Sequence, residues 1–582
     1  MEETALFTMM ALLVVLASLS SIILGKLKLP SIIGFLLTGI IIVNYIGTTD
    51  DTTAVIDIFS DLGLVLLMFT IGIEIDISKL RTQGKFAISI AIIQIPVMIF
   101  AGMITGTALG YGSLQSITLG AVLSGASTAV VLAVLTANKV LDQGKTEILV
   151  LVMIIEDISQ VVMISMLTPM MTGESLSTDS LLVLLINIAV FMIVCATLGL
   201  KLVPKMIDWF YEHSNDEVIS LLCVGLLFAF SLLANMIGLS VAIGAFFTGM
   251  MVSISKPKEV VEKFVSPMKT LFIGMFFISV GSKVSVDSLF ANLELVLILY
   301  IVFCACMFVA VNTGYWVAGG DSRSGWISAF SMCTMGEFAF IISKMAFDNN
   351  IFDQSLYSSI IGAAILSMFI LPLLVRTSEN SFEAADSICP SILKKFLAAV
   401  TKDRDLMYHG LTVASYRTRD RFSKALTNGA FLILLILFIE VVFFSIYDPL
   451  SAWLTANFGG DQYQWRIGIL FANTIILLEP CRRMAKLFKF AIYLKERGEA
   501  HIYSESVDYV GSPFAYGYIS TLAVGAAVTV LIVIIVPNGI DNNTHLLVLF
   551  AVLALVVGYQ FLKYRQKTAK PKDDGLSEED AP

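Results

Sequence analysis

The chain has 582 residues, of which 57% are hydrophobic and only 14% are charged, and its formal net charge is −9. A soluble globular domain carries about 25% charged residues, so this composition excludes an ordinary soluble protein and indicates a polytopic membrane protein. The negative charge comes from the C-terminal tail and from short loops, and no stripe of basic residues indicates nucleic-acid binding. We therefore expect the chain to have the lipid bilayer, and no nucleic acid, as a partner.

Apolar spans of about 20 residues predict helices that cross a membrane. Thirteen such segments lie before residue 377, at 4–25, 31–47, 54–75, 86–110, 115–137, 146–170, 181–204, 217–236, 237–254, 265–284, 290–316, 324–348 and 353–375. The first segment lacks a basic start and a small-residue cleavage site, so we expect a retained helix and not a cleaved signal. Residues 1–376 therefore form the predicted main membrane domain.

The remainder of the chain has a different organisation. Residues 377–425 are charged and mixed, and they predict a cytoplasmic linker. Four further apolar segments, near 426–447, 466–480, 514–536 and 545–562, predict an accessory C-terminal membrane region spanning 426–562. Residues 563–582 form an acidic tail that we expect to be disordered.

Lysine and arginine are distributed unevenly between the loops. The loops after the first, third, fifth, seventh, ninth and eleventh segments carry Lys or Arg, whereas the alternate loops carry almost none. Because cytoplasmic loops are enriched in these residues, we expect the N-terminus outside the cell and the C-terminus in the cytoplasm.

An internal repeat relates two parts of the chain. LPSIIGFLLTG (29–39) matches LSVAIGAFFTG (239–249), and LVLLMFTIGIEIDISKL (64–80) matches TLFIGMFFISVGSKVSVDSL (270–289), at offsets of 210 and 209 residues. The offset spans seven helices, so equivalent helices point in opposite directions. Inverted repeats are typical of secondary transporters and not of an enzyme that merely sits in a membrane.

Two predicted helices contain interruptions at equivalent places. In the segment 115–137, Gly125, Ala126, Ser127 and Thr128 interrupt an apolar run, and in the segment 324–348 the interruption is Gly336 and Glu337. The alternative is close helix packing at small residues. If both helices unwind, their freed carbonyls and helix ends meet at the bilayer midplane and stabilise an ion.

Two adjacent acids, Glu156 and Asp157, lie near the middle of the segment 146–170. A charge at the centre of a membrane helix costs about 2.5–3.5 kcal/mol on insertion scales. Lys283 lies at comparable depth and is the predicted charge partner, whereas we expect Lys344 to extend to the interface. A buried ion pair that only fixes packing is the alternative to a carboxylate that binds a proton or a metal cation.

These stretches together resemble the second family of monovalent cation:proton antiporters, which contains Kef-type and bacterial sodium/proton exchangers. The resemblance covers residues 1–376 and is carried, in order, by KLPSIIGFLLTGIII, DLGLVLLMFTIGIEI, GASTAVVL, the EDISQVV helix, ANMIGLSVAIGAFFTGMMVS, PMKTLFIGMFFISVGSKV and GEFAFIISKMA. It implies a thirteen-helix, all-α antiporter fold with two crossed discontinuous helices, a homodimer, and an elevator-like moving domain.

The resemblance also implies roles for individual residues. Asp157 is the implied site that binds either the cation or the proton, so it is the candidate ligand of the transported metal ion, with Glu156 beside it. Ser127 and Thr128 lie at one helix crossing and Glu337 at the other, supported by Gly125 and Gly336. Lys283 corresponds to the family's basic residue.

Two features depart from the family pattern. The residue before the aspartate is usually Asp, Asn or Gln, and here it is Glu156, which favours an acidic, electrogenic site. Kef-type proteins append a nucleotide-binding domain, but no Gly-x-Gly-x-x-Gly motif follows a predicted strand here, so we expect no cofactor. Glu440, inside FLILLILFIEVVFF, is a functional candidate of the C-terminal region unless it reaches interfacial water.

The function predicted from the sequence is exchange of Na⁺ or K⁺ for H⁺ across the cell membrane, without enzymatic chemistry. A gated cation channel or efflux system on the same scaffold is one alternative, and a non-transporting sensor of pH or salt is another. Proton-coupled, saturable flux would favour the exchanger. The sequence does not choose between Na⁺ and K⁺ or define the stoichiometry.

Overall fold

The structure is a computed structural model. It describes residues 3–26, 30–47, 50–75, 77–138, 140–171, 190–191, 194–237 and 239–391, together with scattered positions between 394 and 483. The chain divides into two compact units, Met1–Ser387 and Ile388–Pro582. In the described part of the chain the regular elements are helices, and the one extended feature is an isolated antiparallel bridge between Ala126 and Met335.

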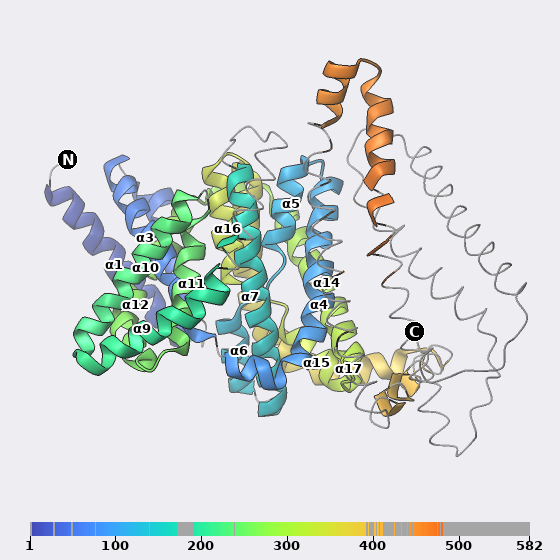
Figure 1. The fold of residues 1–582 in the computed structure, drawn as a ribbon, viewed down its shortest axis with the longest axis horizontal. Coiled ribbons are helices and arrows are strands. Elements are labelled where there is room, and N and C mark those ends of the chain that lie inside the picture. The colour runs from blue at the N-terminus through green and yellow to red at the C-terminus, as the bar shows by residue number, and fades with distance from the viewer. Residues whose placement is uncertain are drawn as a thin grey trace, which may run out of the picture. The chain divides into compact units, whose positions relative to one another are not determined.

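Helices that pack together in the first unit form two bundles, which lie side by side in Figure 1. The first bundle consists of α1 (Glu3–Lys26), α2 (Ser31–Ile41) with its continuation η1 (Ile42–Ile46), α3 (Asp50–Glu74), η2 (Cys195–Gly199), α9 (Leu200–His213), α10 (Asp216–Met236), α11 (Val241–Ile254) and α12 (Lys258–Ser282). The second consists of α4 (Ile77–Ala108), α5 (Ser113–Val122), α6 (Thr128–Asn138), α7 (Gln143–Met171), α14 (Leu293–Val317), α15 (Ser322–Ser331), α16 (Glu337–Asp348) and α17 (Gln354–Ile388). The short helix α13 (Val286–Ala291) joins the bundles between α12 and α14.

Seven helices of the described part are long and apolar enough to span a membrane. They are Thr53–Glu74, Phe86–Ala108, Gln143–Met171, Asp216–Met236, Lys258–Ser282, Leu293–Val317 and Gln354–Ile388. Shorter apolar helices occupy three further predicted spans, and two more predicted spans are each divided into two helices. Eleven of the 24 residues in the predicted segment 181–204 lie outside the described residues, so the count of thirteen stays a prediction.

Glycines allow the helices of the first bundle to approach closely. A Cβ atom added to Gly39 of α2 would lie 3.0 Å from the carbonyl carbon of Gly281 in α12. A Cβ atom added to Gly72 of α3 would lie 2.9 Å from the Cα atom of Gly249 in α11. Larger side chains at these four positions would push the helix backbones apart.

The two glycine contacts are related by the internal repeat. Gly39 is equivalent to Gly249, and Gly72 is equivalent to Gly281, so the repeat exchanges one contact with the other. The bridge between Ala126 and Met335 joins two residues that are themselves 209 positions apart. This reciprocity is the pattern expected of inverted repeats that are related by a pseudo-twofold axis.

The last helix of the first unit is longer than the predicted segment 353–375. α17 continues to Ile388 because its polar extension has partners on α15. Arg323 lies 3.2 Å from Glu379, and the indole N–H of Trp326 donates to the Ser381 hydroxyl over 3.0 Å.

The second unit is described only at scattered positions. Its described residues include helical stretches at 450–458 and 462–473, and Phe443, Tyr447 and Leu470 pack into a small apolar cluster. Glu440 and the predicted segments 514–536 and 545–562 lie outside the described residues. The predicted accessory membrane region therefore stays a prediction.

Candidate ion site at the crossing of two interrupted helices

Both predicted helix interruptions are present, and they lie against each other. α5 ends at Val122 and α6 begins at Thr128, while α15 ends at Ser331 and α16 begins at Glu337. The Ser127 N–H donates to the Thr334 carbonyl and the Gly336 N–H donates to the Gly125 carbonyl, each over 3.1 Å. The two unwound segments therefore satisfy part of each other's backbone.

Two side chains add to the hydrogen bonding of the crossing. The Ala126 N–H donates to the Glu156 carboxylate over 2.7 Å, and the Met335 N–H donates to the Ser367 hydroxyl over 3.0 Å. An unpaired N–H inside a membrane costs several kcal/mol. Glu156 of α7 and Ser367 of α17 are therefore part of what stabilises the breaks.

The helix ends at the crossing carry complementary partial charges. α5 and α16 lie on one side of the crossing and α6 and α15 on the other, as Figure 1 shows. The N-terminal ends of α6 and α16 carry partial positive charge, and the C-terminal ends of α5 and α15 carry partial negative charge. Glu337 stands in the first turn of α16, where the helix dipole favours a carboxylate.

Glu156 is fully buried and is surrounded by amides. Its exposed fraction is 0%, and those of Gln94 and Gln160 are 0% and 1%. The Gln94 amide lies 3.4 Å from the Ser124 carbonyl, and the Gln160 amide lies 3.5 Å from the Ala121 carbonyl. One side-chain oxygen of each of these three residues has no hydrogen-bond partner within the described residues. The crossing thus presents oxygen acceptors in a buried setting.

Asp157 lies next to this arrangement and is only partly buried by the protein. Its carboxylate interacts electrostatically with those of Glu337, Glu156 and Glu74. The lysine that attracts Glu337, Lys269, is itself paired with Glu74 at 2.9 Å. None of the ion pairs between described residues includes Asp157, Glu156 or Glu337. This excess of negative charge favours a cation or a proton as the compensating charge.

Ser127, Thr128, Gly125 and Gly336 also lie at the crossing. Ser127 is buried within the break, and Thr128 begins α6 and is partly exposed. Gly125 packs against the side chain of Gln160, since an added Cβ atom would lie 2.7 Å from the amide carbon of Gln160. Gly336 packs in the same way against the backbone of Ala126.

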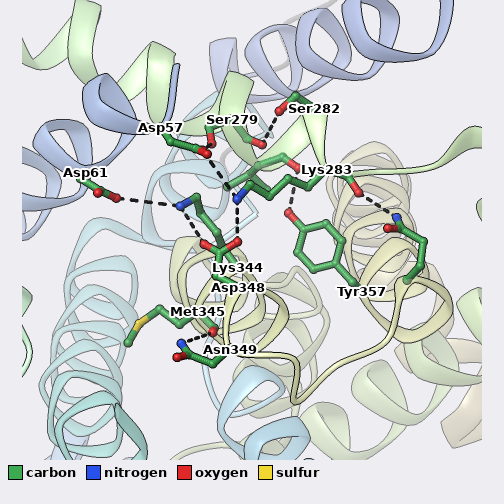
Figure 2. Close-up of polar contacts among 12 residues, drawn as sticks. Asp57, Asp61, Ser279, Ser282, Lys283, Lys344, Met345, Asp348, Asn349 and Tyr357 are labelled. Carbon is green, nitrogen blue, oxygen red and sulfur yellow. Dashed lines mark hydrogen bonds and ion pairs between the residues drawn. The ribbon is translucent and has the colours of Figure 1, made fainter. Parts of the chain in front are cut away.

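Lys283 is not brought to the acids, contrary to the expected pairing. It follows the last residue of α12, and its ammonium group lies 2.5 Å from Asp348 and 3.6 Å from Asp57 (Figure 2). The physical reason is its place at the end of the helix, since the acids lie midway along α7. Those acids therefore keep their charge uncompensated by Lys283 in this structure.

The expectation that Lys344 extends to the membrane interface stays a prediction. Lys344 is 8% exposed and lies one turn before the end of α16. Its ammonium group lies 3.0 Å from Asp348, one helical turn later, and 3.9 Å from Asp61. The carboxylate one turn away compensates the charge of Lys344.

The sequence did not lead us to Gln94 as part of the site. The signal was present, because Gln94 is a lone amide in the apolar stretch SIAIIQIPVMIF. A polar side chain inside a membrane helix requires a partner, and here that partner is the broken helix. Asp57 and Asp348 were also missed as the partners of Lys283.

Comparisons with known proteins show which family the chain belongs to. The family described as sodium/hydrogen exchanger, transmembrane, matches residues 11–377. The chain belongs to the sodium/hydrogen exchanger family. This family assignment confirms the resemblance drawn from the sequence motifs.

Several relatives of this sodium/hydrogen exchanger family member align with about two thirds of the chain. An Na⁺/H⁺ antiporter of Enterococcus hirae is 29% identical over 373 residues, which are 63% of this chain and 96% of the relative. The Na⁺/H⁺-K⁺ antiporter GerN of Bacillus cereus is 23% identical over 386 residues, which are 66% of this chain and 98% of the relative. The K⁺ efflux antiporter 6 of Arabidopsis thaliana is 26% identical over 362 residues, which are 60% of this chain and 59% of the relative.

A solved structure shares the fold of this exchanger family member. The sodium proton antiporter MjNhaP1 of Methanocaldococcus jannaschii matches with a TM-score of 0.52 and 19% sequence identity, over 66% of this chain and 98% of the other. The protein is thus an all-helical, multi-span membrane protein with an antiporter fold. The relatives named above are transporters and not enzymes.

Proposed function

We propose that the chain exchanges a monovalent cation, Na⁺ or K⁺, for H⁺, and that Asp157 carries the two ions alternately. The observation that carries the proposal is the position of Asp157 beside Glu156, which accepts a hydrogen bond from the broken helix at Ala126. The relatives that share this membrane unit are named as Na⁺/H⁺ and K⁺ efflux antiporters.

The proposed chemistry follows from charge balance. A lone carboxylate in a membrane is costly unless a cation or a proton compensates it. Because one carboxylate accepts only one of the two at a time, binding of the cation releases the proton and binding of the proton releases the cation. Ser127 and Thr128 at the start of α6, and backbone carbonyls of the breaks, are candidate oxygen ligands for the dehydrated cation.

Glu156 has a different role in this proposal. Its carboxylate already accepts the Ala126 N–H and is buried among amides, so it holds the break in place beside Asp157. The second oxygen of Glu156, which has no hydrogen-bond partner within the described residues, is available to the same site. Because Glu156 is an acid and not an amide, we propose that the exchange is electrogenic.

Alternating access in the proposal is of the elevator type. The second bundle, which holds both broken helices and the acids, moves against the first bundle, which serves as the scaffold of a homodimer. We propose thirteen membrane helices, an extracellular N-terminus and a cytoplasmic C-terminus in the cell membrane. The alternation of basic loops and the inverted repeat support this arrangement.

The test uses the full chain in sealed, acid-loaded proteoliposomes. Addition of Na⁺ or K⁺ is expected to dissipate the pH gradient for the wild type and not for Asp157→Asn. Gly225→Ala, at a site of α10 with no atom within 4 Å of the added methyl group, is the matched control. Cation flux that does not depend on the proton gradient would contradict the proposal and indicate a channel. Absence of flux, with both proteins inserted in the membrane, would contradict it and indicate a sensor.

A further inference from the structure

A cluster of five charged side chains lies away from the crossing, between α3, α12 and α16. Lys283 at the end of α12 lies 2.5 Å from Asp348 of α16 and 3.6 Å from Asp57 of α3. Lys344 of α16 lies 3.0 Å from Asp348 and 3.9 Å from Asp61 of α3. Figure 2 shows the two ammonium groups placed between the three carboxylates. We call these residues the five-residue ion cluster.

This cluster joins the two bundles. Asp57, Asp61 and Lys283 belong to the first bundle, and Lys344 and Asp348 belong to the second. Among the described residues, ion pairs connect the bundles only at Lys283–Asp348 and Lys344–Asp61. The other ion pairs in the described part of the first unit each lie within one bundle. Examples are Lys269–Glu74 at 2.9 Å and Lys256–Glu212 at 2.6 Å.

The cluster lies at one end of the interface. Asp348 is the last residue of α16 and Lys283 follows the last residue of α12, whereas Glu337 begins α16 at the crossing. Beside the cluster, the hydroxyl of the buried Tyr357 donates to the Val280 carbonyl over 2.8 Å, which links α17 to α12. The ion pairs therefore hold the two bundles together at this end. In the predicted orientation this end faces the outside of the cell.

We propose that the five-residue ion cluster positions the second bundle in the inward-facing conformation and must separate during each exchange cycle. This inference rests on the proposed elevator movement. A slide of the second bundle along α3 and α12 would move Asp348 and Lys344 away from partners that are fixed to the first bundle. A packed interface with discrete pairings gives two stable conformations and not a continuum.

The two lysines of the cluster are largely covered by protein, whereas its carboxylates are partly exposed. The side-chain exposures are 10% for Lys344 and 18% for Lys283, against 33% for Asp348, 37% for Asp57 and 76% for Asp61. Removal of one partner from a poorly hydrated pair leaves the other charge uncompensated. Lys283→Gln and Asp348→Asn should each weaken the closed conformation and populate the alternative one.

The test is hydrogen–deuterium exchange of the full chain in lipid nanodiscs, which requires no transported ion. In Lys283→Gln and in Asp348→Asn, amides at residues 283–292 and 344–356 are expected to exchange at least about 5-fold faster, the lower end of typical conformational coupling. Lys256→Gln breaks an ion pair inside one bundle and is expected to leave these segments unchanged. Both changes remove the Lys283–Asp348 pair, but one also removes Lys283–Asp57 and the other Lys344–Asp348, so the effect of the double variant should lie between the greater single effect and the sum of the two.

The outcomes separate this proposal from the exchange function. Single variants that match Lys256→Gln in both segments would overturn the role of the cluster, even if Asp157-dependent exchange is intact. If the single variants accelerate exchange throughout the chain, the double variant decides: acceleration confined to the two segments supports the proposal, and chain-wide acceleration overturns it. A wild type that carries no cation–proton exchange would overturn the function without altering this readout.

A cross-link supplies the functional counterpart. Lys283→Cys combined with Asp348→Cys, joined by a short bifunctional maleimide, should hold the two bundles together. We expect cation–proton exchange to fall to the level of protein-free liposomes in the cross-linked protein. The variants with only one of the two substitutions, Lys283→Cys or Asp348→Cys, are treated with the same reagent. They control for modification of the native cysteines. Full-rate exchange in the cross-linked protein would show that these helix ends do not need to separate.

Discussion

Gly336→Ala perturbs the crossing of the two broken helices with the smallest possible side chain. The added Cβ atom would lie 2.8 Å from the Ala126 carbonyl oxygen and 3.3 Å from the Gly125 carbonyl oxygen. Both atoms belong to the backbone of the opposite break, so no side-chain rotation relieves the contact. The hydrogen bond from the Gly336 N–H to Gly125, 3.1 Å long, must lengthen.

The cost of this change is that of overpacking a dense interior. Extra methyl groups in such places typically cost about 1–3 kcal/mol. The backbone angles of Gly336 (φ −79°, ψ 173°) are open to alanine, so the whole penalty comes from the lack of space. If the penalty falls on the crossed conformation alone, the ratio of that conformation to its alternatives decreases about 5- to 150-fold.

The assay compares initial exchange rates in proteoliposomes with thermal unfolding in detergent. Gly336→Ala is expected to lower both the rate and the unfolding midpoint, whereas Gly225→Ala, which meets nothing within 4 Å, should change neither appreciably. Equal rates and equal midpoints for the two variants would refute the claim that the backbones of the breaks touch at Gly336.

Glu156→Ala leaves the Ala126 N–H unpaired and should cost about 1–3 kcal/mol in unfolding free energy, whereas Glu156→Gln keeps an acceptor and should cost less; chemical unfolding of both variants checks the difference. Gly249→Ala places a methyl group 2.9 Å from the Cα atom of Gly72, so the thermal unfolding midpoint should decrease despite the roughly 1 kcal/mol gain in helix propensity. A chain ending at Ile388 should still fold and exchange ions, since the first unit packs by itself and contains the residues 11–377 that match the exchanger family. Loss of exchange in a folded truncated chain would assign an essential role to the C-terminal unit.

The helix breaks could be predicted because their signal is local. Gly125, Ser127 and Gly336 interrupt long apolar runs, and the repeat placed both interruptions at equivalent positions. That symmetry also led us to expect that the two breaks meet. The site acids followed from the cost of a charge inside a membrane helix.

The partners of the lysines could not be predicted in the same way. The sequence allowed us to infer how deep Lys283 lies in the membrane. It did not show the partners of Lys283, because Asp57 and Asp348 lie on helices far away in sequence. Which charges meet depends on helix rotation and packing, which small residues such as Gly39 control. The partners of Lys344, Asp61 and Asp348, were missed for the same reason.

Counting protons shows whether one carboxylate, Asp157, binds the proton and the cation alternately. Na⁺ or K⁺ is added to the purified protein in weakly buffered detergent solution, and proton release is measured with a pH indicator. We expect proton release that saturates with cation concentration in the wild type and is absent in Asp157→Asn. Equal release from both proteins would contradict this expectation.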